Sequence, residues 1–389
     1  MRVILVNDWF LGAGQEQRTF QGLLALFPES KITALFYDHK NLPPELKKRD
    51  IDASFLQKFP GRLKYSYHLM PLYPAAIRRL GLDNADLLIA NSQGYAKAAI
   101  ANRTALHVCY CHAPLPFAWE PLEWQFPKDE IGHWRYRFIE KLAERFRRWD
   151  HMAAGQIDLF VASSESVRQK IRQLYGRPAK VIYPPVDTEY FTPAQPDRQG
   201  YFLMVGPLTR RKRFDIAIAT FNSIKDKLVV VGDGPDFLRL VNSSPGNVSF
   251  TGHISDEKLR EHYRNCQAII VTSDSDFSMA ALEAAACGKP VIAFAGAGMQ
   301  EMFPSKSDAG SANYILSDYG LLVKERPAIG LKEAIKAIRA ESFDSAEIRR
   351  NTLRFSKQVF FGQMRDFLTE AVGVFRQEGR VKLEERLIE

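Results

Sequence analysis

The sequence predicts an α/β fold built from two domains. Short apolar runs alternate with helical or polar stretches over most of the 389 residues, which is typical of parallel sheets covered by helices on both faces. The chain is long for one domain and long enough for two, each with its own hydrophobic core. Prolines in residues 184–199 interrupt regular structure near the middle of the chain. We therefore expect two Rossmann-like halves, joined by this stretch.

The first domain, predicted at residues 1–190, opens with a strand and a helix. The strand is expected at residues 2–6 and the helix at 16–27. Further apolar runs predict strands at 32–36, 86–90, 106–110, 159–162 and 181–183. Residues 133–149 show a helical pattern crowded with Arg, Trp and Phe.

The second domain, predicted at residues 191–364, repeats the alternation. Its strands are expected at 201–205, 228–231, 248–250, 268–271 and 291–294, and a terminal helix follows at 355–377. Ligands of open parallel sheets bind outside the carboxyl ends of the strands. Two such sheets facing one another therefore predict a site in the cleft between them.

Composition indicates an ordinary globular protein, with 46% hydrophobic and 25% charged residues. The four cysteines are few and lack the paired spacing of a zinc site, which favours a reduced, cytoplasmic setting. No apolar run reaches the ~18 residues that cross a bilayer, and the first residues do not resemble a signal peptide. The net charge of +8 is not accompanied by a recognised nucleic-acid motif, so nucleic acid is not expected as a partner.

Residues 274–293 are the most informative segment, because an acidic loop leads there into an Ala-rich helix and then into an apolar strand. The segment resembles the donor-site signature of family 4 glycosyltransferases, retaining enzymes with the GT-B fold. In that family one Glu meets the donor sugar and a second, eight residues later, meets the nucleotide ribose. Glu283 matches the second Glu, whereas Ser275 stands at the first position and Ser278 at a Gly position.

Other segments match the same family in the same order, over about residues 1–371. They are residues 91–97, 109–114, 117–119, 183–187 and 231–235, and they are similar to a bacterial branch that includes mannosyltransferases of O-antigen and exopolysaccharide assembly. The resemblance implies a terminal helix that crosses back to the first domain, which we expect at 365–389.

The resemblance also implies how the donor diphosphate is held. Gly12 and Gly14 match the family's first loop, where backbone N–H groups at a helix N-terminus approach the diphosphate, although Gln15 occupies a position that is often Gly. Lys212 matches the Lys of a second, basic loop. Pro207 replaces the Arg of that loop, so Arg211 or its neighbour Arg210 is the candidate for the missing guanidinium.

Further donor contacts are implied for the loop and helix around the signature. We expect them from Asp276, Phe277, Ser278, Met279, Glu283 and Glu301. Glu283, which we also predict to be catalytic, is expected in the first turn of its helix. A carboxylate there is favourable for the helix dipole as well as for ribose binding, and its identity does not separate the two. Asp274 and Asp276 mimic a metal-binding pair, but the resemblance implies a reaction without metal.

His112 is the second predicted catalytic residue. It follows the strand at 106–110 and is expected to be exposed at the carboxyl edge of the sheet. The resemblance implies contact with the donor sugar or the acceptor, and we assign it positioning and electrostatic stabilisation rather than proton abstraction. A purely structural histidine is the alternative.

Two segments bear on the acceptor. Residues 58–80 and 133–149 combine basic and aromatic side chains, in a chain with a pI near 9.2. They favour contact with an anionic inner membrane, where lipid-linked acceptors lie. Helices packed on the sheet with a solvated basic face explain them equally well.

The predicted function is transfer of mannose from GDP-mannose, with retention and an α linkage, to a lipid-linked oligosaccharide or growing surface polysaccharide. A nucleotide-sugar epimerase or hydrolase on the same fold is one alternative. A nucleotide-sugar-binding subunit without turnover is another, because Gln15, Pro207, Ser275 and Ser278 depart from the family pattern.

Overall fold

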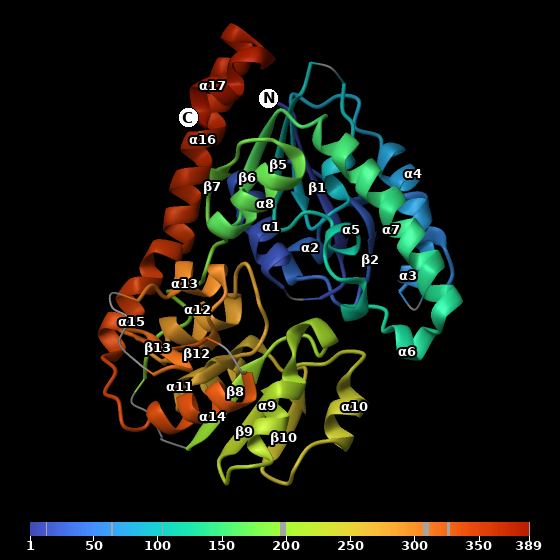
Figure 1. Ribbon diagram of the computed structural model, residues 1–389. Helices are drawn as coiled ribbons and strands as arrows, with labels where there is room; N and C mark the ends of the chain where they lie inside the picture. The colour runs from blue at the N-terminus through green and yellow to red at the C-terminus, as the bar shows by residue number, and fades with distance from the viewer. Residues whose placement is uncertain are drawn as a thin grey trace. The chain divides into compact units, whose positions relative to one another are not determined.

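The computed structural model consists of two compact units and describes residues 1–12, 14–63, 65–102, 104–194, 200–305, 311–324 and 327–388 (Figure 1). Unit 1 comprises Met1–Pro185 and Gln358–Glu389, and unit 2 comprises Val186–Lys357. The predicted ranges divided the chain at residues 190 and 364, a few residues later in each case. The reason is local: Val186 accepts a hydrogen bond from Lys357 N at 3.1 Å and donates one to the Phe355 carbonyl at 2.8 Å, which holds both connecting segments to unit 2.

Unit 1 is built on one parallel sheet, with the strand order β3-β2-β1-β4-β5-β6-β7. The strands are β1 Val3–Phe10, β2 Lys31–Tyr37, β3 Ile51–Ala53, β4 Leu87–Ser92, β5 Leu106–Cys111, β6 Leu159–Ala162 and β7 Lys180–Val181. The first six follow the order 3-2-1-4-5-6 of the doubly wound dinucleotide-binding fold. The strand order therefore reverses between β1 and β4.

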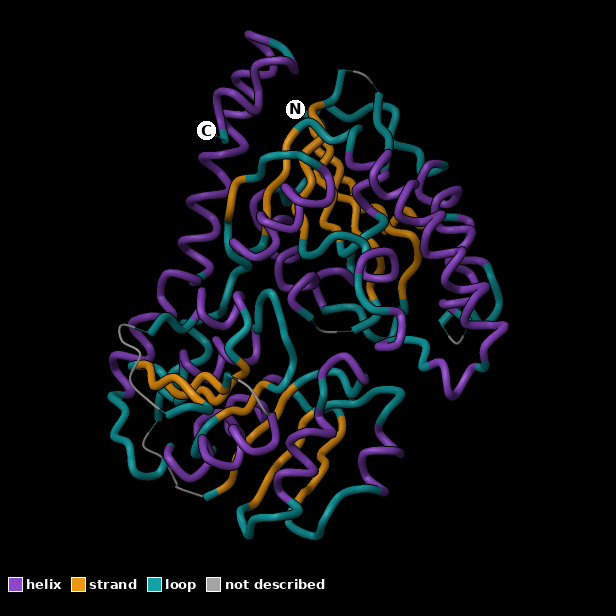
Figure 2. Tube along the Cα trace, in the orientation of Figure 1, coloured by secondary structure: helices purple, strands orange, loops and turns teal. Residues whose placement is uncertain are grey.

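Helices cover both faces of this sheet (Figures 1 and 2). Alternate residues of β1 and β4 divide between two cores, one beneath α4 and α7 and the other beneath α1 and α16. The helices of unit 1 are α1 Gln15–Leu26, α2 Pro44–Lys47, α3 Ser66–Leu69, α4 Tyr73–Arg78, α5 Pro116–Trp119, α6 Lys128–Ile131, α7 His133–Ala154, α8 Glu165–Tyr175, α16 Lys357–Glu378 and α17 Leu383–Leu387. Short 3₁₀ turns lie at η1 Phe55–Lys58, η2 Met70–Leu72, η3 Ala96–Ala98, η4 Leu122–Trp124 and η7 Arg380–Lys382.

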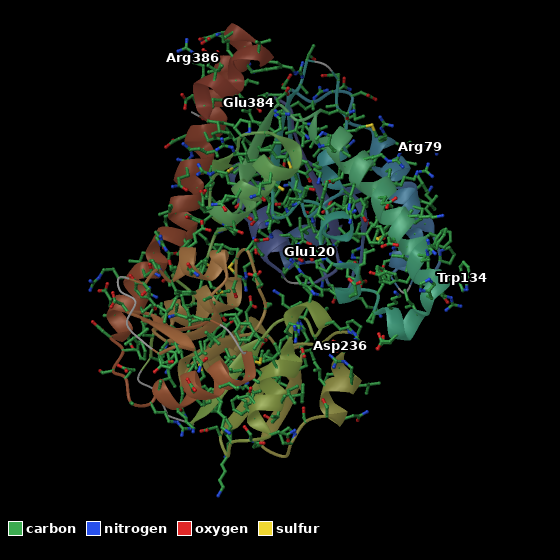
Figure 3. All side chains as sticks on the ribbon, viewed as in Figure 1. Arg79, Glu120, Trp134, Asp236, Glu384 and Arg386 are labelled. Atoms are coloured by element: carbon green, nitrogen blue, oxygen red, sulfur yellow. The ribbon has the colours of Figure 1, made fainter. Side chains whose placement is uncertain are left out.

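The C-terminal segment Gln358–Glu389, with α16 and α17, belongs to unit 1. Phe360, Met364 and Leu368 of α16 are buried in the core that α1 shares with the sheet. Glu384, labelled on α17 in Figure 3, accepts a hydrogen bond from Arg177 Nε at 2.7 Å and so ties α17 to the chain after α8. Apolar contacts and this ion pair together hold the terminal segment to unit 1.

Unit 2 repeats the architecture, with the strand order β10-β9-β8-β11-β12-β14-β13. Its strands are β8 Tyr201–Val205, β9 Lys227–Val231, β10 Val248–Gly252, β11 Ile269–Val271, β12 Val291–Phe294, β13 Tyr314–Ser317 and β14 Gly320–Val323. Its helices are α9 Phe214–Phe221, α10 Phe237–Asn242, α11 Asp256–Asn265, α12 Met279–Ala286, α13 Ala297–Met302, α14 Pro327–Ala337 and α15 Ser345–Thr352, with 3₁₀ turns η5 Arg210–Lys212 and η6 Leu353–Phe355. Here the order reverses between β8 and β11.

The prediction of two Rossmann-like α/β domains is confirmed, with differences in detail. The first strand continues past residue 6 to Phe10, because Asn7 and Asp8 are buried and hydrogen-bonded instead of starting a loop. The edge strand β3 and the hairpin of β13 and β14 were not predicted. The antiparallel pairing of β13 with β14 means that the second sheet is not wholly parallel. Within the described residues, no helix is both long and apolar enough to cross a membrane.

Candidate functional site

In each unit the predicted site residues gather where the strand order reverses. A doubly wound sheet opens a crevice there, outside the carboxyl ends of the two diverging strands. In unit 1 these are the ends of β1 and β4, with β5 beside them. In unit 2 they are the ends of β8 and β11, with β12 beside them.

His112 lies directly after β5 but is not exposed, contrary to the prediction. Only 6% of its surface is accessible, because the ring is held by polar neighbours on both sides. Nε2 lies 2.8 Å from Asn91 Oδ1 at the end of β4, and Nδ1 lies 3.2 Å from Gln15 Nε2 at the start of α1. The histidine is therefore part of a packed polar network at the switch point of unit 1.

Burial also sets the charge of this histidine. Desolvation lowers the pKa of His112 from about 6.5 to about 3, so the ring is neutral near pH 7. A neutral imidazole can position and polarise a hydroxyl but supplies no full positive charge. This fits the predicted positioning role and removes the imidazolium form as a source of stabilisation near neutral pH.

Asp8, near the end of β1, fixes the loop that follows β4. Its carboxylate accepts hydrogen bonds from the backbone N–H groups of Gln93 at 2.6 Å, Tyr95 at 3.0 Å and Ala96. Burial raises the pKa of Asp8 to about 6, against the opposing effect of these N–H groups and of Lys97. The loop is thus tied to a carboxylate that is charged above about pH 6.

The glycine loop leads from β1 into α1. Gly12 is exposed, Ala13 lies outside the described residues, and Gly14 is the N-cap of α1. The Gly14 carbonyl accepts hydrogen bonds from the backbone N–H groups of Gln17 and Arg18. A Cβ added at Gly14 would lie 2.7 Å from the carboxylate oxygens of Glu16, the flexible end of that side chain, so a larger residue here would require Glu16 to move. The predicted contact of this loop with a diphosphate stays a prediction.

In unit 2 the basic loop after β8 forms the turn η5, with three successive cations. Lys212 Nζ donates to Ser275 Oγ at 3.4 Å, and the Lys212 carbonyl accepts from Thr272 Oγ1 at 2.9 Å. Arg210 lies 3.9 Å from Asp236, which marks the start of α10 in Figure 3. The loops after β8 and β11 are therefore joined at the switch point through Lys212 and Ser275, and Arg211 precedes Lys212 in the same turn.

Ser275 is buried, although it stands where a longer carboxylate was expected from the family pattern. Its hydroxyl lies 2.7 Å from Ser273 Oγ and is also the group that Lys212 contacts. Asp274 on one side is exposed and Asp276 on the other is half-buried. The position is occupied by a small, neutral and internally hydrogen-bonded side chain.

The helix α12 begins one residue after its cap. Ser278 Oγ accepts a hydrogen bond from Ala281 N at 3.3 Å, so this serine caps the helix, and Met279 is the first helical residue. Phe277 is buried, with its ring 5.9 Å from that of Phe355. These two contacts give Phe277 and Ser278 clear structural roles in addition to the predicted donor contacts.

Glu283 lies in the second turn of α12, not in the first as predicted, because the helix starts at Met279. The helix-dipole explanation is weakened accordingly, since that effect falls off within the first turn. The side chain is buried and Glu283 Oε2 accepts a hydrogen bond from the Tyr263 hydroxyl at 3.0 Å. The carboxylate is thus oriented by α11, the helix that carries Tyr263.

The start of α13 packs against the signature loop. A side chain at Gly298 would collide with the main-chain carbonyls of Ser275 and Asp276, so only glycine permits this approach. Glu301, later in α13, is half-buried, and its carbonyl accepts a hydrogen bond from Arg354 at 2.7 Å. Its predicted donor role stays a prediction.

Several polar residues of the sites were not singled out from the sequence. They are Asn7, Asp8, Asn91, Lys97, Asp150 and Ser273, and Gly298 is a further residue that was not singled out. The signal for Asn7, Asp8 and Asn91 was their place at the end of apolar strands. Among the described residues, no group of three or more His, Cys, Asp and Glu side chains is arranged to hold a metal ion.

Comparison with known proteins identifies the class. Residues 32–190 match the family model described as Glycosyltransferase Family 4, and residues 199–340 match that described as Glycosyl transferases group 1. An uncharacterized glycosyltransferase of Methanocaldococcus jannaschii is 26% identical over 314 residues, which is 78% of either chain.

Solved structures agree on the fold. Anabaena Alr3699/HepE in complex with UDP and glucose superimposes with a TM-score of 0.65 at 17% identity, over 95% of this chain and 100% of that one. Sucrose-phosphate synthase from Thermosynechococcus elongatus gives 0.66 at 16% identity, over 96% and 100%. The fold is GT-B. The two family matches, one in each unit, make the chain a glycosyltransferase similar to family 4.

Proposed function

We propose that the protein is a retaining hexosyltransferase that moves mannose from GDP-mannose, in an α linkage and without a divalent metal, onto a lipid-linked oligosaccharide or growing surface polysaccharide. The observation that carries the proposal is the meeting of the η5 cations with the loop of Ser275 at the switch point of unit 2. Guanidinium and ammonium groups at such a crevice suit the oxygens of a diphosphate.

The chemistry follows from the two kinds of side chain at the switch points. Lys212 and Arg211 would stabilise the negative charge that develops on the departing nucleoside diphosphate. Glu283, held by Tyr263, would accept hydrogen bonds from ribose hydroxyls. His112, neutral and packed, would orient a sugar hydroxyl. The mannosyl donor is proposed from the similarity of the motifs, and the named structural relatives in complex with UDP and UDP-glucose make UDP-sugars the comparison donors.

Incubation with GDP-mannose, UDP-glucose, UDP-galactose and UDP-N-acetylglucosamine, each with and without membrane extract, tests this function. Mass spectrometry of the products should show consumption of GDP-mannose only when an acceptor is present. Consumption without acceptor would mean an epimerase or hydrolase. Binding without any consumption would mean a subunit that does not turn over.

The absence of a metal requirement has its own test. Calorimetric titration with GDP and with UDP should show binding in excess chelator, because the η5 cations take the role that a divalent ion has at other phosphate sites. A binding signal that disappears with chelator and returns with magnesium would overturn this part of the proposal.

The outer face of α7 supports a membrane-bound acceptor. Trp134 is 83% and Phe138 70% exposed, and Lys141, Arg145 and Arg148 continue the same stripe at helical spacing. The opposite face, with Phe146, packs on the core. Trp134 and Phe138 are therefore not needed to pack α7 onto that core. Trp134 and Arg79 of the neighbouring basic segment lie at the outer edge of unit 1 in Figure 3.

Vesicle co-sedimentation tests this contact. We expect binding to vesicles with phosphatidylglycerol and little binding to pure phosphatidylcholine, and we expect loss of binding in the double variant Trp134→Ser, Phe138→Ser. The matched control is Met152→Ser, which removes an exposed apolar side chain from the far end of the same helix. Equal sedimentation of wild type and double variant would contradict the proposal.

A further inference from the structure

A chain of side-chain amides connects β1, β4 and the residue after β5. Asn7 Nδ2 donates to the Trp9 carbonyl at 2.7 Å, and Asn91 Nδ2 donates to Asn7 Oδ1 at 2.6 Å and to the Glu16 carbonyl at 2.9 Å. Asn7 and Asn91 are each only 1% exposed. Both amides are therefore part of the interior, where their polar atoms require partners.

The main-chain carbonyls fix which way each amide points. The oxygen and nitrogen of an Asn side chain are nearly indistinguishable by shape, so their assignment depends on the network. A carbonyl can only accept, so the atom of Asn91 that faces the Glu16 carbonyl must be the NH₂ group. The other atom, which faces His112 Nε2 at 2.8 Å, must then be the carbonyl oxygen.

The position of the histidine proton follows. Since Asn91 Oδ1 can only accept, His112 Nε2 must carry the hydrogen. A buried neutral ring holds one proton, so Nδ1 presents a lone pair. The Gln15 amide at 3.2 Å is the group that donates to this lone pair in the structure. Every donor in the network points the same way, from Gln15 through His112 and Asn91 to the Glu16 carbonyl and, through Asn7, to the Trp9 carbonyl.

We propose that Asn91 is a positioning residue that fixes His112 as the Nε2–H tautomer, so that Nδ1 accepts a hydrogen bond from bound substrate, and that the Gln15 amide fills this acceptor until the substrate displaces it. Gln15 is half-buried at the start of α1, whereas Asn91 is locked in the interior. Only the outer end of the network can therefore exchange partners.

The inference restricts the substrate group that His112 can meet. Nδ1 can accept from a hydroxyl or an N–H group, but it repels a carboxylate or phosphate oxygen. That the group is a sugar hydroxyl rests on the proposed function. The tautomer and the role of Gln15 rest only on the network.

Nitrogen NMR of the intact protein with ¹⁵N-labelled histidine tests the tautomer. The His112 signals are identified by their absence in His112→Gln. Between pH 6.5 and 8 the wild type should show one protonated nitrogen, Nε2, and one unprotonated nitrogen, Nδ1. Signals of the Nδ1–H tautomer or of imidazolium at pH 7 would overturn the inference. This measurement does not require that a variant of Asn91 folds.

Two variants then locate the cause. Asn91→Leu removes the acceptor at nearly constant volume, so the Nε2–H form should lose its exclusive population, whereas Gln15→Met should shift the Nδ1 signal and leave Nε2 unchanged. His107 on the same strand is the internal control, because it is buried but outside this network. An unchanged tautomer in Asn91→Leu, or an unchanged Nδ1 signal in Gln15→Met, would refute the corresponding half. Neither NMR result depends on which nucleotide sugar the protein uses. Failure of the transfer assay, which tests the proposed function, can therefore be told apart from failure of this inference.

Discussion

Two lysines follow central strands at the two switch points, Lys97 after β4 in unit 1 and Lys212 after β8 in unit 2, and their surroundings differ. Lys97 is 0% exposed, and its ammonium lies 2.6 Å from Asp150, which is equally buried, and 3.0 Å from the Tyr175 hydroxyl. Lys212 is half-buried, and its ammonium contacts the hydroxyl of Ser275 beside two arginines.

The difference shows how the same residue type serves two purposes. Burial disfavours the charge of Lys97, but Asp150 beside it holds the pKa of this lysine well above its ordinary value. That cation is paired within the fold, and the separate His112 network of the same unit consists of neutral amides and a neutral imidazole. The cations of η5 lie close together at the edge of their sheet, where an anionic ligand would relieve their mutual repulsion. On the proposed function, the His112 network of unit 1 would position a substrate group, whereas the cations of unit 2 would attract a negatively charged one.

The largest expected effect breaks the buried pair. Lys97→Met leaves Asp150 charged and buried, which should cost about 3–5 kcal/mol in the free energy of unfolding, whereas Lys212→Met should change it by less than about 1 kcal/mol. Urea unfolding of both variants measures the contrast. Adding Asp150→Leu to Lys97→Met should recover part of the loss. Equal losses for the two lysines would remove the distinction between the units.

The second prediction concerns ligand affinity and reverses the order of the two lysines. Lys212→Ala should weaken binding of GDP or UDP about 10- to 100-fold, because charge-assisted hydrogen bonds contribute about 1.5–3 kcal/mol. Arg213→Ala is the matched control: Arg213 is adjacent and exposed, and it pairs with Asp215 at 3.3 Å. Calorimetry with both variants is the measurement. Equal, small effects would show that the diphosphate binds elsewhere.

The sequence predicts the unit 2 site better than the unit 1 site, for a physical reason. The η5 cations form one continuous run and the Ser275 loop with its helix forms another, so each half of the site is encoded by local spacing, although the contact between them spans 63 residues. The unit 1 network joins Asn7, Gln15, Asn91 and His112, which only the parallel pairing of β1, β4 and β5 brings together. No local pattern encodes such contacts, and His112 was accordingly expected to be exposed.

The fold shows the same limit. Strands β8 and β12 have the bounds that their apolar runs predict, because each run is bounded by turn residues. The strand β1 was predicted too short, since Asn7 and Asp8 are polar, and their burial depends on partners some 84 or more residues away. The β13–β14 hairpin was missed because its short strands follow a segment without a clear alternating pattern.

A third prediction uses pH to separate neutral from charged chemistry. The folded pKa of His112, about 3, lies below its unfolded value of about 6.5, so the folded state binds fewer protons between these values. This contribution to stability is complete above pH 6.5 and is lost as pH falls. From pH 6.5 to 5.0 the wild type should therefore lose about 2 kcal/mol relative to His112→Gln.

The difference between the two proteins is the quantity to measure, by urea unfolding at each pH. His107, whose pKa burial lowers to about 4, contributes in the same direction to both proteins. Asp8 contributes in the opposite direction, because its raised folded pKa of about 6 gives stability that is lost as pH rises. Both effects cancel in the difference. A difference that does not change with pH would mean that His112 is charged in the folded protein.

The smallest expected effect tests whether the neutral character of Ser275 matters to the cationic site. Ser275→Glu places a carboxylate beside Lys212, whose ammonium now contacts the serine hydroxyl at 3.4 Å. The new ion pair would compete with a diphosphate, so affinity for GDP or UDP should fall about fivefold, roughly 1 kcal/mol. Ser275→Ala is the control that removes the hydroxyl without adding charge, and its affinity should stay within about twofold of wild type. If Ser275→Glu instead raises both affinity and turnover, the loop is a site that lost a useful carboxylate. The contrast between the two units would then be smaller, because unit 2 would need a precisely placed hydrogen-bond acceptor, as unit 1 does, in addition to its positive charge.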